Sequence, residues 1–271
     1  MKMRPRVTVI IPAYNIEQYI GRCLQSVLMQ RGRFDCGVCI LEDASTDQTM
    51  KMIRETLAAN PPPSYMTVKI LPSPHNLGRQ QNYNRFWDYL MKECHSDYVT
   101  VIDGDDWWTT PYRIYRHVRY HALHPSCPGS CCGVYLYDQT ADRYCLHPDQ
   151  LALYYAGEKK LDAHLMARSN PTSTMGSCFY KLSALKKVSD DLLQFEWADW
   201  LLHLMISWQG ALGYLPEPMI AYRLLEHSDS HGHERPKLPS ENILRIQAYV
   251  NNRFQNKYAT DIEKFISTFY R

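Results

Sequence analysis

The segment DYVTVIDGDDWW, residues 97–108, places three carboxylates directly after an apolar run. The run is short and rich in β-branched residues, which is typical of a buried strand. The carboxylates belong to Asp103, Asp105 and Asp106, and three like charges within four positions repel one another in a folded chain. Two explanations fit this pattern: a cation binds at the end of the strand, or the segment is a solvated turn.

Three strand–helix units precede this segment. In each of them, a run of apolar residues is followed by apolar residues at helical spacing. We expect strands at 6–12, 36–45 and 67–72, followed by a fourth strand at 97–106. We expect the first helix at 16–30, the second after a cap at Thr46, and the third within 75–94. Parallel strands joined by crossover helices form a doubly wound sheet, so the sequence predicts an α/β fold.

Four polar clusters lie where the expected strands end. They are AYN (13–15), EDAS (42–45), SPHNLG (73–78) and DGDD (103–106). In doubly wound sheets, ligands bind beyond the carboxyl ends of the strands. The four clusters are therefore expected to meet on one rim of the sheet and to form a ligand site there.

The second half of the chain has a different pattern. We expect shorter strands at 131–138, 143–147, 176–182 and 213–225, and helices at 112–124 and 197–209. A polar segment at 228–240 is typical of a linker, and amphipathic helices at 240–254 and 258–270 close the chain. The sequence thus predicts a smaller mixed region and C-terminal helices beside the doubly wound sheet.

Composition and net charge exclude few classes of function. The formal net charge of +2 over 271 residues produces no strong overall field, so no stable nucleic-acid partner is inferred. The nine cysteines are an odd number spread through apolar segments, which favours a reduced, cytoplasmic protein over a disulfide framework. No apolar run has the length needed to span a bilayer, and peripheral contact with a membrane is left open.

Asp103 and Asp105 predict a divalent metal site. Residues two apart on an extended backbone point the same way, so these carboxylates are expected on one side of the strand. Oxygen ligands suit Mg²⁺ or Mn²⁺, which leave positions for phosphate oxygens. The alternative is that the aspartates cap a helix that begins near Thr110. Asp106 is expected to point away from the other two and to be structural, at the start of that helix.

Side chains on the other strand ends are candidates for binding a nucleotide. Asp43 can accept a hydrogen bond from the imide of a pyrimidine base, and Tyr14 can stack on the base. The alternatives are a helix cap that Asp43 forms with Ser45 and Thr46, and ordinary packing of Tyr14. Arg79 follows the permissive Gly78 and can reach a diphosphate, whereas a solvated arginine is equally compatible with the sequence.

A carboxylate in the apolar segment FEWADWLLHL (195–204) is a candidate general base. Asp199 lies among three tryptophans at helical spacing. A carboxylate beside aromatic rings is typical of groups that remove a proton from a substrate hydroxyl. The alternative is that Asp199 caps the helix or faces solvent.

Taken in order, these motifs resemble those of the family 2 glycosyltransferases, which have the GT-A fold. The resemblance covers roughly residues 6–230. Its motifs are VTVIIPAYN (7–15), EDASTDQT (42–49), HNLGRQQNYNRFW (75–87), DYVTVIDGDDWW (97–108), ADWLLHL (198–204) and GYLPEPMIAYR (213–223). No single motif is decisive, and the specificity lies in their order and spacing.

The resemblance implies the inverting transfer of a sugar from a nucleotide-diphosphate donor to an acceptor hydroxyl, with Mn²⁺ or Mg²⁺ as cofactor. A UDP-sugar is expected, because Asp43 fits the imide of uracil, although thymine presents the same edge. Residues 1–110 would form the nucleotide-sugar-binding half of a GT-A domain, 111–230 its acceptor-binding and catalytic half, and 231–271 a linker and C-terminal helices.

Carried over by position, the family's site residues fall into three groups. Asp199 would be the general base. The metal would be bound by Asp105, Asp103 and His227. The nucleotide sugar would be bound by Ala13, Tyr14, Asn15, Asp43, Gly78, Arg79, Asp103 and Gly104.

Two departures from the family's pattern affect the donor site and the base. Ala198 precedes the expected base where the family usually has glutamate, which weakens the motif but keeps the aspartate. Tyr83 stands where many members have an arginine, so the diphosphate contact is expected from Arg79 or Arg85.

A third departure affects the metal site. Leu225 stands where many members have a metal-binding histidine. We expect His227 to replace it, before His231 or His233, although this segment is also typical of a polar loop.

Two other functions are compatible with the sequence. A sugar nucleotidyltransferase shares the nucleotide-binding sheet and the metal, but IPAYNIEQYIG (11–21) lacks the glycine-rich basic loop of those enzymes. The third function is a zinc-stabilised binding module, whose irregularly spaced ligands would come from Cys36, Cys39, Cys127, Cys131, Cys132, Cys145 and His147.

The acceptor is not readable from the sequence. A glycan, a lipid-linked glycan, a peptide and a modified nucleobase all fit, and the segment SNPTSTMGS (169–177) offers hydroxyls near the site. The C-terminal helices are expected to cover the acceptor cleft, to form a homodimer or to touch a membrane.

Overall fold

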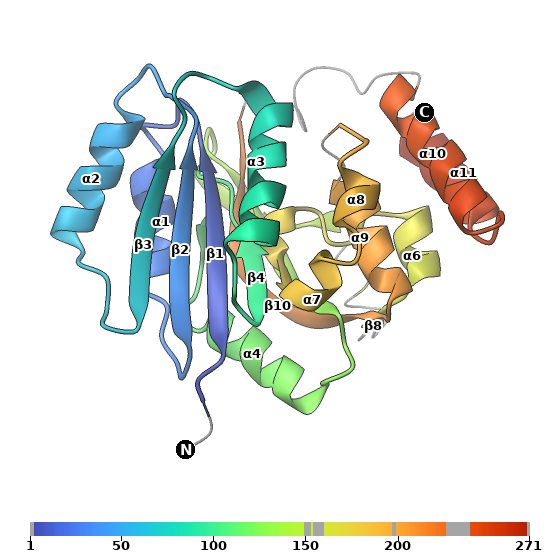
Figure 1. The fold of residues 1–271 in the computed structure, drawn as a ribbon, viewed down its shortest axis with the longest axis horizontal. Coiled ribbons are helices and arrows are strands. Elements are labelled where there is room, and N and C mark those ends of the chain that lie inside the picture. Colours follow the sequence, from blue (N-terminus) through green and yellow to red (C-terminus); the bar gives the residue numbers. More distant parts are fainter. Residues whose placement is uncertain (1–2, 149–152, 154–159, 197–198, 226–238, 270–271) are drawn as a thin grey trace.

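The first half of the chain forms a parallel sheet with helices on both faces (Figure 1). The computed structural model describes residues 3–148, 153, 160–196, 199–225 and 239–269. The first seven elements are β1 (Arg6–Ala13), α1 (Ile20–Leu28), β2 (Asp35–Glu42), α2 (Thr49–Ala59), β3 (Met66–Pro72), α3 (Gly78–Lys92) and β4 (Tyr98–Val101). These four strands lie in the order β3-β2-β1-β4, and each neighbouring pair is parallel.

Both faces of this sheet are covered, which explains the continuous apolar runs of its strands. Alternate residues of β1 belong to two different cores. Val9 and Ile11 pack with apolar residues of α1, and Ile10 packs in the core that contains Trp87 of α3. All three β1 side chains are fully buried. Burying a side chain of this size contributes about 1.5–3 kcal/mol.

The sheet continues into the second half of the chain. The helical elements there are α4 (Arg113–Leu123), α6 (Ala163–Arg168), the 3₁₀ turn η1 (Met175–Ser177), α7 (Leu182–Leu185), α8 (Ser189–Leu192), α9 (Asp199–Trp208), α10 (Glu241–Arg253) and α11 (Ala259–Phe269). The strands are β5 (Trp107–Trp108), β6 (Gly129–Asp138), β7 (Arg143–Leu146), β8 (Lys160–Leu161), β9 (Cys178–Lys181) and β10 (Leu212–Leu224).

β9 joins the two halves of the sheet. It pairs antiparallel with β4 on one side and with β6 on the other, and β6 pairs parallel with β10. The result is one mixed sheet of ten strands, whose main path is β3-β2-β1-β4-β9-β6-β10-β5. This architecture confirms the predicted α/β fold, with its parallel part and its smaller mixed part.

Two expected boundaries were wrong because the chain turns at the rim. The first helix begins at Ile20 and not at residue 16, since Asn15 has a φ of 50° and a turn joins Tyr19 N to Ile16 O at 2.9 Å. The fourth strand ends at Val101 and not at residue 106. Residues 103–106 form a separate turn, closed by a 3.0 Å hydrogen bond from Asp106 N to Asp103 O.

The expected cap of the second helix was also wrong. α2 begins at Thr49, whose backbone N–H donates to Asp47 Oδ1 at 2.9 Å. The backbone N–H of Thr46 donates instead to Asn15 Oδ1 at 2.8 Å. Thr46 therefore holds two rim loops together and does not cap the helix.

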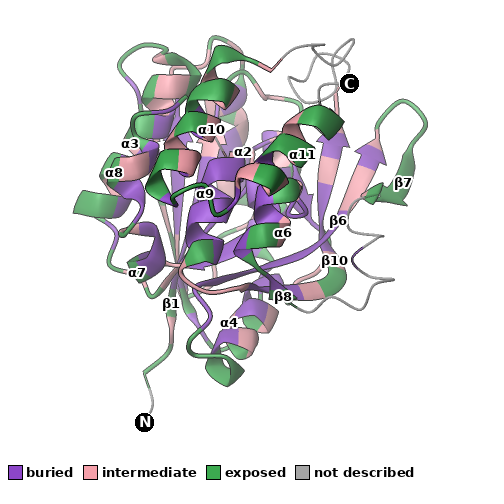
Figure 2. Cartoon of the chain, turned by 90° about the vertical axis from the view of Figure 1, so that its right-hand side faces the viewer, coloured by how far each residue is buried: buried purple, intermediate pink, exposed green. Residues whose placement is uncertain are grey.

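The C-terminal helices pack against the rest of the chain. The ring centroids of Trp200 in α9 and Phe265 in α11 lie 4.4 Å apart, and those of Trp208 and Phe254 lie 5.1 Å apart. Ile246 of α10 is fully buried in the same core. Figure 2 shows that the opposite faces of α10 and α11 are exposed. Among the described residues, no helix combines the length and apolar character that a membrane span requires.

Candidate active site

The strand register brings the four polar clusters together as expected. Ala13 lies beside Glu42, and Glu42 lies beside Pro72, so the ends of β1, β2 and β3 coincide. Val101 at the end of β4 pairs with Ile10 of β1, which places residues 103–106 next to the other three clusters. The rim at the top of the sheet in Figure 1 is therefore a polar site built from four strand ends.

Asn15 and Tyr14 have different positions in this site. Asn15 Oδ1 accepts from Thr46 N, and its own backbone N–H donates to Ser45 Oγ at 3.1 Å. These bonds tie the loop after β1 to the loop after β2. Tyr14 is 41% exposed, so a face of its ring is open to a ligand. Ala13, between Pro12 and Tyr14, is buried in the core.

Asp43 joins the end of β2 to the start of α3. Its buried carboxylate accepts hydrogen bonds from Ser73 Oγ at 2.9 Å, Leu77 N at 3.0 Å and Gly78 N at 3.1 Å. A carboxylate has about four acceptor positions, so one position on Oδ2 remains. The alternative of a cap with Ser45 was wrong, because Ser45 N donates to Glu42 Oε1 at 2.7 Å.

The two arginines of α3 differ in what they contact. Arg85 donates to Leu71 O at 2.8 Å and to Ser73 Oγ, and its Nη1 lies 3.9 Å from Asp43 Oδ1. Its guanidinium thus holds the ends of β2 and β3. The charge of Arg79 instead lowers the pKa of Asp103, which places Arg79 toward the acidic turn. Gly78, just before it, has a φ of 74°, a backbone conformation that glycine adopts readily.

Gly104 packs the acidic turn tightly against the loop after β1. A Cβ atom at this position would lie 2.2 Å from Ile16 Cδ1 and 3.1 Å from Pro12 O. The sequence motif includes this glycine for a steric reason, since no side chain fits between the turn and the loop. Asp103 and Asp105 on either side of it are half-buried.

The substitution Gly104→Ala is expected to lower the free energy of unfolding by about 1–3 kcal/mol, because the added methyl group overpacks this contact. Urea denaturation measures the change. Gly21→Ala in α1 is the matched control, since its Cβ would meet Thr56 Oγ1 at an ordinary 3.4 Å. Alanine should raise stability there by up to about 1 kcal/mol through helix propensity. An equal loss of stability in both variants would contradict the steric explanation.

Burial raises the pKa values of all three carboxylates of the turn, and neighbouring carboxylates add to the rise at Asp103 and Asp106. Burial raises the pKa of Asp103 to about 7, and the charges of Asp105 and Asp199 add to the rise. Burial also raises the pKa of Asp105, while the charge of Arg223 lowers it. The pKa of Asp106 is raised well above its ordinary value by burial and then by Asp105 and Asp103. A cation at the turn would offset this repulsion.

Asp106 is structural, but its partner is not the helix after Pro111. Its Oδ1 accepts from the backbone N–H of Arg223 in β10 at 2.9 Å, while its Oδ2 is buried with no hydrogen-bond partner. On an extended backbone, Asp103 and Asp105 would lie on one side of the strand and Asp106 on the other. This expectation was wrong, because residues 103–106 form a turn.

Arg223 is a site residue that the sequence analysis did not single out. Its Nε donates to Asp105 O at 2.9 Å, and its Nη1 donates to Gln139 Oε1 at 2.8 Å. The guanidinium lies 4.5 Å from the ring centroid of Tyr19 and 4.8 Å from that of Trp107. Arg223 thus fixes the acidic turn to β10. The YR pair at 222–223 was its only local sign in the sequence.

The chemistry of the acidic turn fits a hard divalent cation. Asp103 and Asp105 offer oxygen ligands, and Mg²⁺ and Mn²⁺ are often held by one or two carboxylates together with substrate phosphates. Among the described residues, no group of three or more His, Cys, Asp or Glu side chains could hold a metal ion alone. His227, and with it His231 and His233, lies outside the described residues.

The cysteines do not support a zinc site. Burial raises the pKa of Cys36 to about 12 and that of Cys39 to about 11. Burial likewise raises the pKa of Cys131 and Cys132. No three-ligand group was found in the described part of the chain, which includes all nine cysteines.

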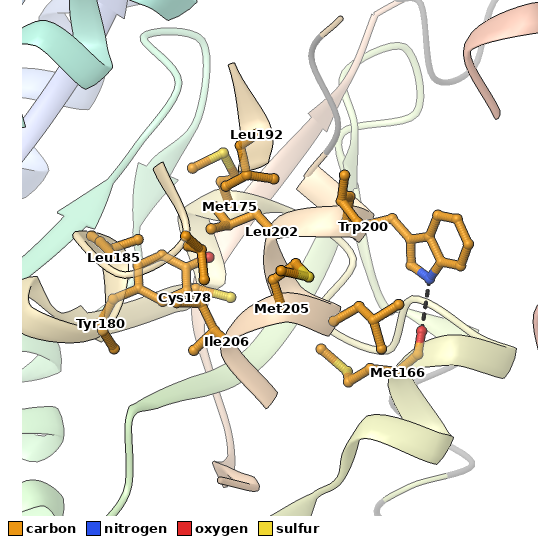
Figure 3. Packing of buried hydrophobic residues seen from close by; sticks show 14 of the residues in the cluster. Met166, Met175, Cys178, Tyr180, Leu185, Leu192, Trp200, Leu202, Met205 and Ile206 are labelled. Carbon is orange, nitrogen blue, oxygen red and sulfur yellow. Dashed lines mark hydrogen bonds between the residues drawn. The ribbon is translucent and has the colours of Figure 1, made fainter. Parts of the chain in front are cut away.

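Asp199 begins α9 and lies near the acidic turn. Its Oδ1 accepts from Trp200 N at 2.7 Å, its side chain is half-buried, and its charge raises the pKa of Asp103. The helix is held from behind by a dense core, shown in Figure 3, where Trp200 Nε1 donates to Met166 O at 2.7 Å. Asp199 is therefore at a helix start and also near the turn. Glu196, three residues earlier, is exposed.

Comparisons with known proteins agree with this geometry. Residues 8–189 match the model of the family described as glycosyl transferase family 2. An uncharacterised protein of Mycobacterium tuberculosis is 26% identical over 238 residues, which are 83% of this chain and 60% of that protein. The chain thus spans about three fifths of the length of this protein and of two further curated relatives.

Two solved structures share the fold. TarS of S. aureus, in complex with UDP-GlcNAc, has a TM-score of 0.70 at 17% identity, covering 98% of this chain and 74% of that one. The mannosyltransferase PcManGT of Pyrobaculum calidifontis, in complex with GDP-Man and Mn²⁺, has a TM-score of 0.58 at 16% identity, covering 99% of this chain and 70% of that one. At these identities the likeness shows the fold alone.

Proposed function

The chain belongs to glycosyl transferase family 2, and from this premise we propose that it transfers a sugar from a UDP-sugar to an acceptor hydroxyl with inversion at the anomeric carbon, in a reaction that depends on Mn²⁺ or Mg²⁺. One observation carries the proposal. Asp199, from the second half of the chain, lies close enough to Asp103 for its charge to raise the pKa of that carboxyl group. Such a transfer requires a base close to the donor site.

The donor is proposed to lie along the rim from β2 to β4. The remaining acceptor position on Asp43 Oδ2 would take the imide N–H of uracil, and the exposed ring of Tyr14 would stack on the base. Arg79 would pair with the diphosphate, because its charge acts on Asp103 in the acidic turn. The two solved structures contain different nucleotides, so the proposal that the base is uracil depends on Asp43.

Asp105, with Asp103 beside it, would hold the cation, and His227 is the proposed third protein ligand. When bound, the metal supplies positive charge to the leaving diphosphate. Arg223 would hold the turn in place through the carbonyl of Asp105 and the carboxylate of Asp106. The fit rests on the oxygen donors of the turn and on the buried, unpartnered Oδ2 of Asp106.

Asp199 is proposed to take the proton of the acceptor hydroxyl. As the proton moves to its carboxylate, the hydroxyl oxygen forms a bond to the anomeric carbon, and the bond from that carbon to the diphosphate oxygen breaks. Attack from the face opposite the diphosphate inverts the configuration. The family match speaks against a sugar nucleotidyltransferase and a binding module.

Several broader assignments are proposals with less support. They are the division at residues 110 and 230, a cytoplasmic location with or without membrane contact, and an acceptor that is a glycan, a lipid-linked glycan, a peptide or a modified nucleobase. A homodimer through α10 and α11 would have to use their exposed faces, because the apolar face packs on α6 and α9.

A thermal-shift panel tests the proposed donor and metal. UDP-GlcNAc, UDP-glucose, UDP-galactose and GDP-mannose are compared, each with Mn²⁺ and with EDTA. A ligand at about 100 times its Kd stabilises by about 2.7 kcal/mol, so we expect at least one UDP-sugar with Mn²⁺ to raise Tm by about 5–10 °C. The same shift in EDTA would contradict metal dependence. A shift with GDP-mannose alone would contradict the uracil assignment.

A further inference from the structure

The turn formed by residues 169–177 lies against α9 and has no role in the donor site. Two side chains of this turn, those of Asn170 and Thr172, form one hydrogen-bonded group with His203 of α9. Thr172 Oγ1 donates to Asn170 Oδ1 at 2.7 Å, and His203 Nδ1 lies 2.7 Å from Thr172 Oγ1 and 3.2 Å from Asn170 Oδ1. Thr172 and His203 are fully buried, whereas Asn170 is half-buried.

The direction of these bonds follows from the number of protons. The single hydroxyl proton of Thr172 goes to Asn170, so His203 Nδ1 must carry a hydrogen and donate it to Thr172. His203 Nε2 is then an acceptor, 3.6 Å from Cys178 Sγ. Burial lowers the pKa of His203 to about 4, although the charge of Asp199 raises it, so the ring is neutral.

In this arrangement the Asn170 amide has a defined orientation. Its Oδ1 accepts from the buried side of the turn, at Thr172 and His203. The amide is planar, so Nδ2 and its two N–H groups lie on the other, partly open side. No described residue accepts a hydrogen bond from Nδ2. The structure thus presents two hydrogen-bond donors at a half-buried surface.

This amide lies close to the proposed base. His203 follows Asp199 by four positions in α9, so the two side chains share one face of the helix with about 5–6 Å between their Cβ atoms. The effect of Asp199 on the pKa of His203 agrees with this closeness. Asn170, 3.2 Å from His203, is therefore on the side of α9 on which Asp199 acts.

We propose that Asn170 binds the acceptor. Its Nδ2 donates to a hydroxyl oxygen adjacent to the attacking hydroxyl. Thr172 and His203 are positioning residues that hold the amide in this orientation. The inference rests on the proposed function. A carboxylate that accepts from one hydroxyl, beside an amide that donates to the next, suits the neighbouring hydroxyls of a saccharide. The structure thereby selects a saccharide among the acceptor classes.

The test separates transfer to a saccharide from transfer to water. The full chain is supplied with the UDP-sugar that releases UDP fastest, with and without methyl glycosides of glucose, galactose and N-acetylglucosamine. UDP release and disaccharide mass are measured. Wild type is expected to form a disaccharide. Asn170→Asp, which replaces the two donors by an acceptor, should raise the KM for the glycoside about tenfold or more and should lower hydrolysis by a smaller factor than transfer.

Two further variants sharpen the result. Thr172→Val removes the hydroxyl that orients Asn170 and should raise the same KM by a smaller factor. Ser169→Ala is the matched control in the same turn, because Ser169 Oγ donates to Leu165 O at 2.9 Å and not to the amide. The KM of this variant for the glycoside should equal that of wild type. Nitrogen NMR of the imidazole should show the Nδ1–H form of His203.

Each contrary result has its own meaning. Equal losses of hydrolysis and transfer in Asn170→Asp would overturn the inference, because the residue would then act through the fold or the base. Wild-type hydrolysis without any disaccharide would overturn the saccharide assignment, and an Nε2–H imidazole would overturn the positioning roles. An absence of UDP release from every nucleotide sugar would instead overturn the proposed function itself.

Discussion

Asp199→Asn is expected to lower turnover by about 10²–10⁴-fold while the affinity for the donor changes by less than about twofold. The amide cannot take the acceptor proton, but its Oδ1 can still accept from Trp200 N, so the start of α9 is preserved. UDP release and disaccharide formation give the turnover, and calorimetric titration of UDP with Mn²⁺ gives the affinity. The loss is specific to the chemical step, because Asp199 is not among the proposed donor or metal ligands.

Glu196→Gln is the matched control for this variant. It removes one carboxylate charge three residues earlier, from an exposed side chain, and should leave turnover unchanged. Similar losses in both variants would mean that the net charge near α9 matters and not the position of one base. Wild-type turnover in Asp199→Asn would remove the residue from the mechanism.

Asp105→Asn is expected to weaken Mn²⁺-dependent binding of UDP by about 100-fold or more, because a neutral amide replaces an anionic oxygen ligand. The contact between Arg223 Nε and Asp105 O involves the backbone and should survive the substitution. Calorimetric titration of UDP in Mn²⁺ and in EDTA measures the metal-dependent part. The weak binding in EDTA should not fall.

The control for Asp105→Asn is Asp88→Asn, on the exposed face of α3. Asp88 pairs only with Lys92, at 3.0 Å, among the described residues, and both side chains are mostly exposed. We expect its UDP binding to equal that of wild type in both buffers. If Asp105→Asn binds UDP with Mn²⁺ as tightly as wild type, the cation is held elsewhere.

The sheet and its rim could be predicted from the sequence because both depend on local patterns. Apolar runs ending in polar clusters recur four times in the first half of the chain, and parallel pairing then brings the four ends together. Individual boundaries failed where backbone conformation overrode the apolar pattern. Asn15 adopts a positive φ, and the DGDD segment leaves the strand to form a turn.

The supporting residues of the site could not be predicted, because they act over long sequence separations. Arg223 reaches Asp105 and Asp106 from 118 and 117 residues away, and His203 reaches Asn170 from 33 residues away. A single arginine or histidine in an apolar segment has no local signature. The contacts of Arg223 and His203 are visible only in the structure, where β10 lies beside the turn and α9 lies beside residues 169–177. Asp43 and Asp199 could be proposed from the sequence because they stand within recognisable motifs.

The pairing of β9 with both β4 and β6 couples the two halves of the candidate site. The acidic turn follows β4, and residues 169–177 lead directly into β9, so a single strand register sets the separation between the turn and these residues. A chimaera joined at residue 110 would combine halves whose registers were never matched. Substitutions within residues 169–177 that leave the sheet intact would change the side chains of the site without changing this separation.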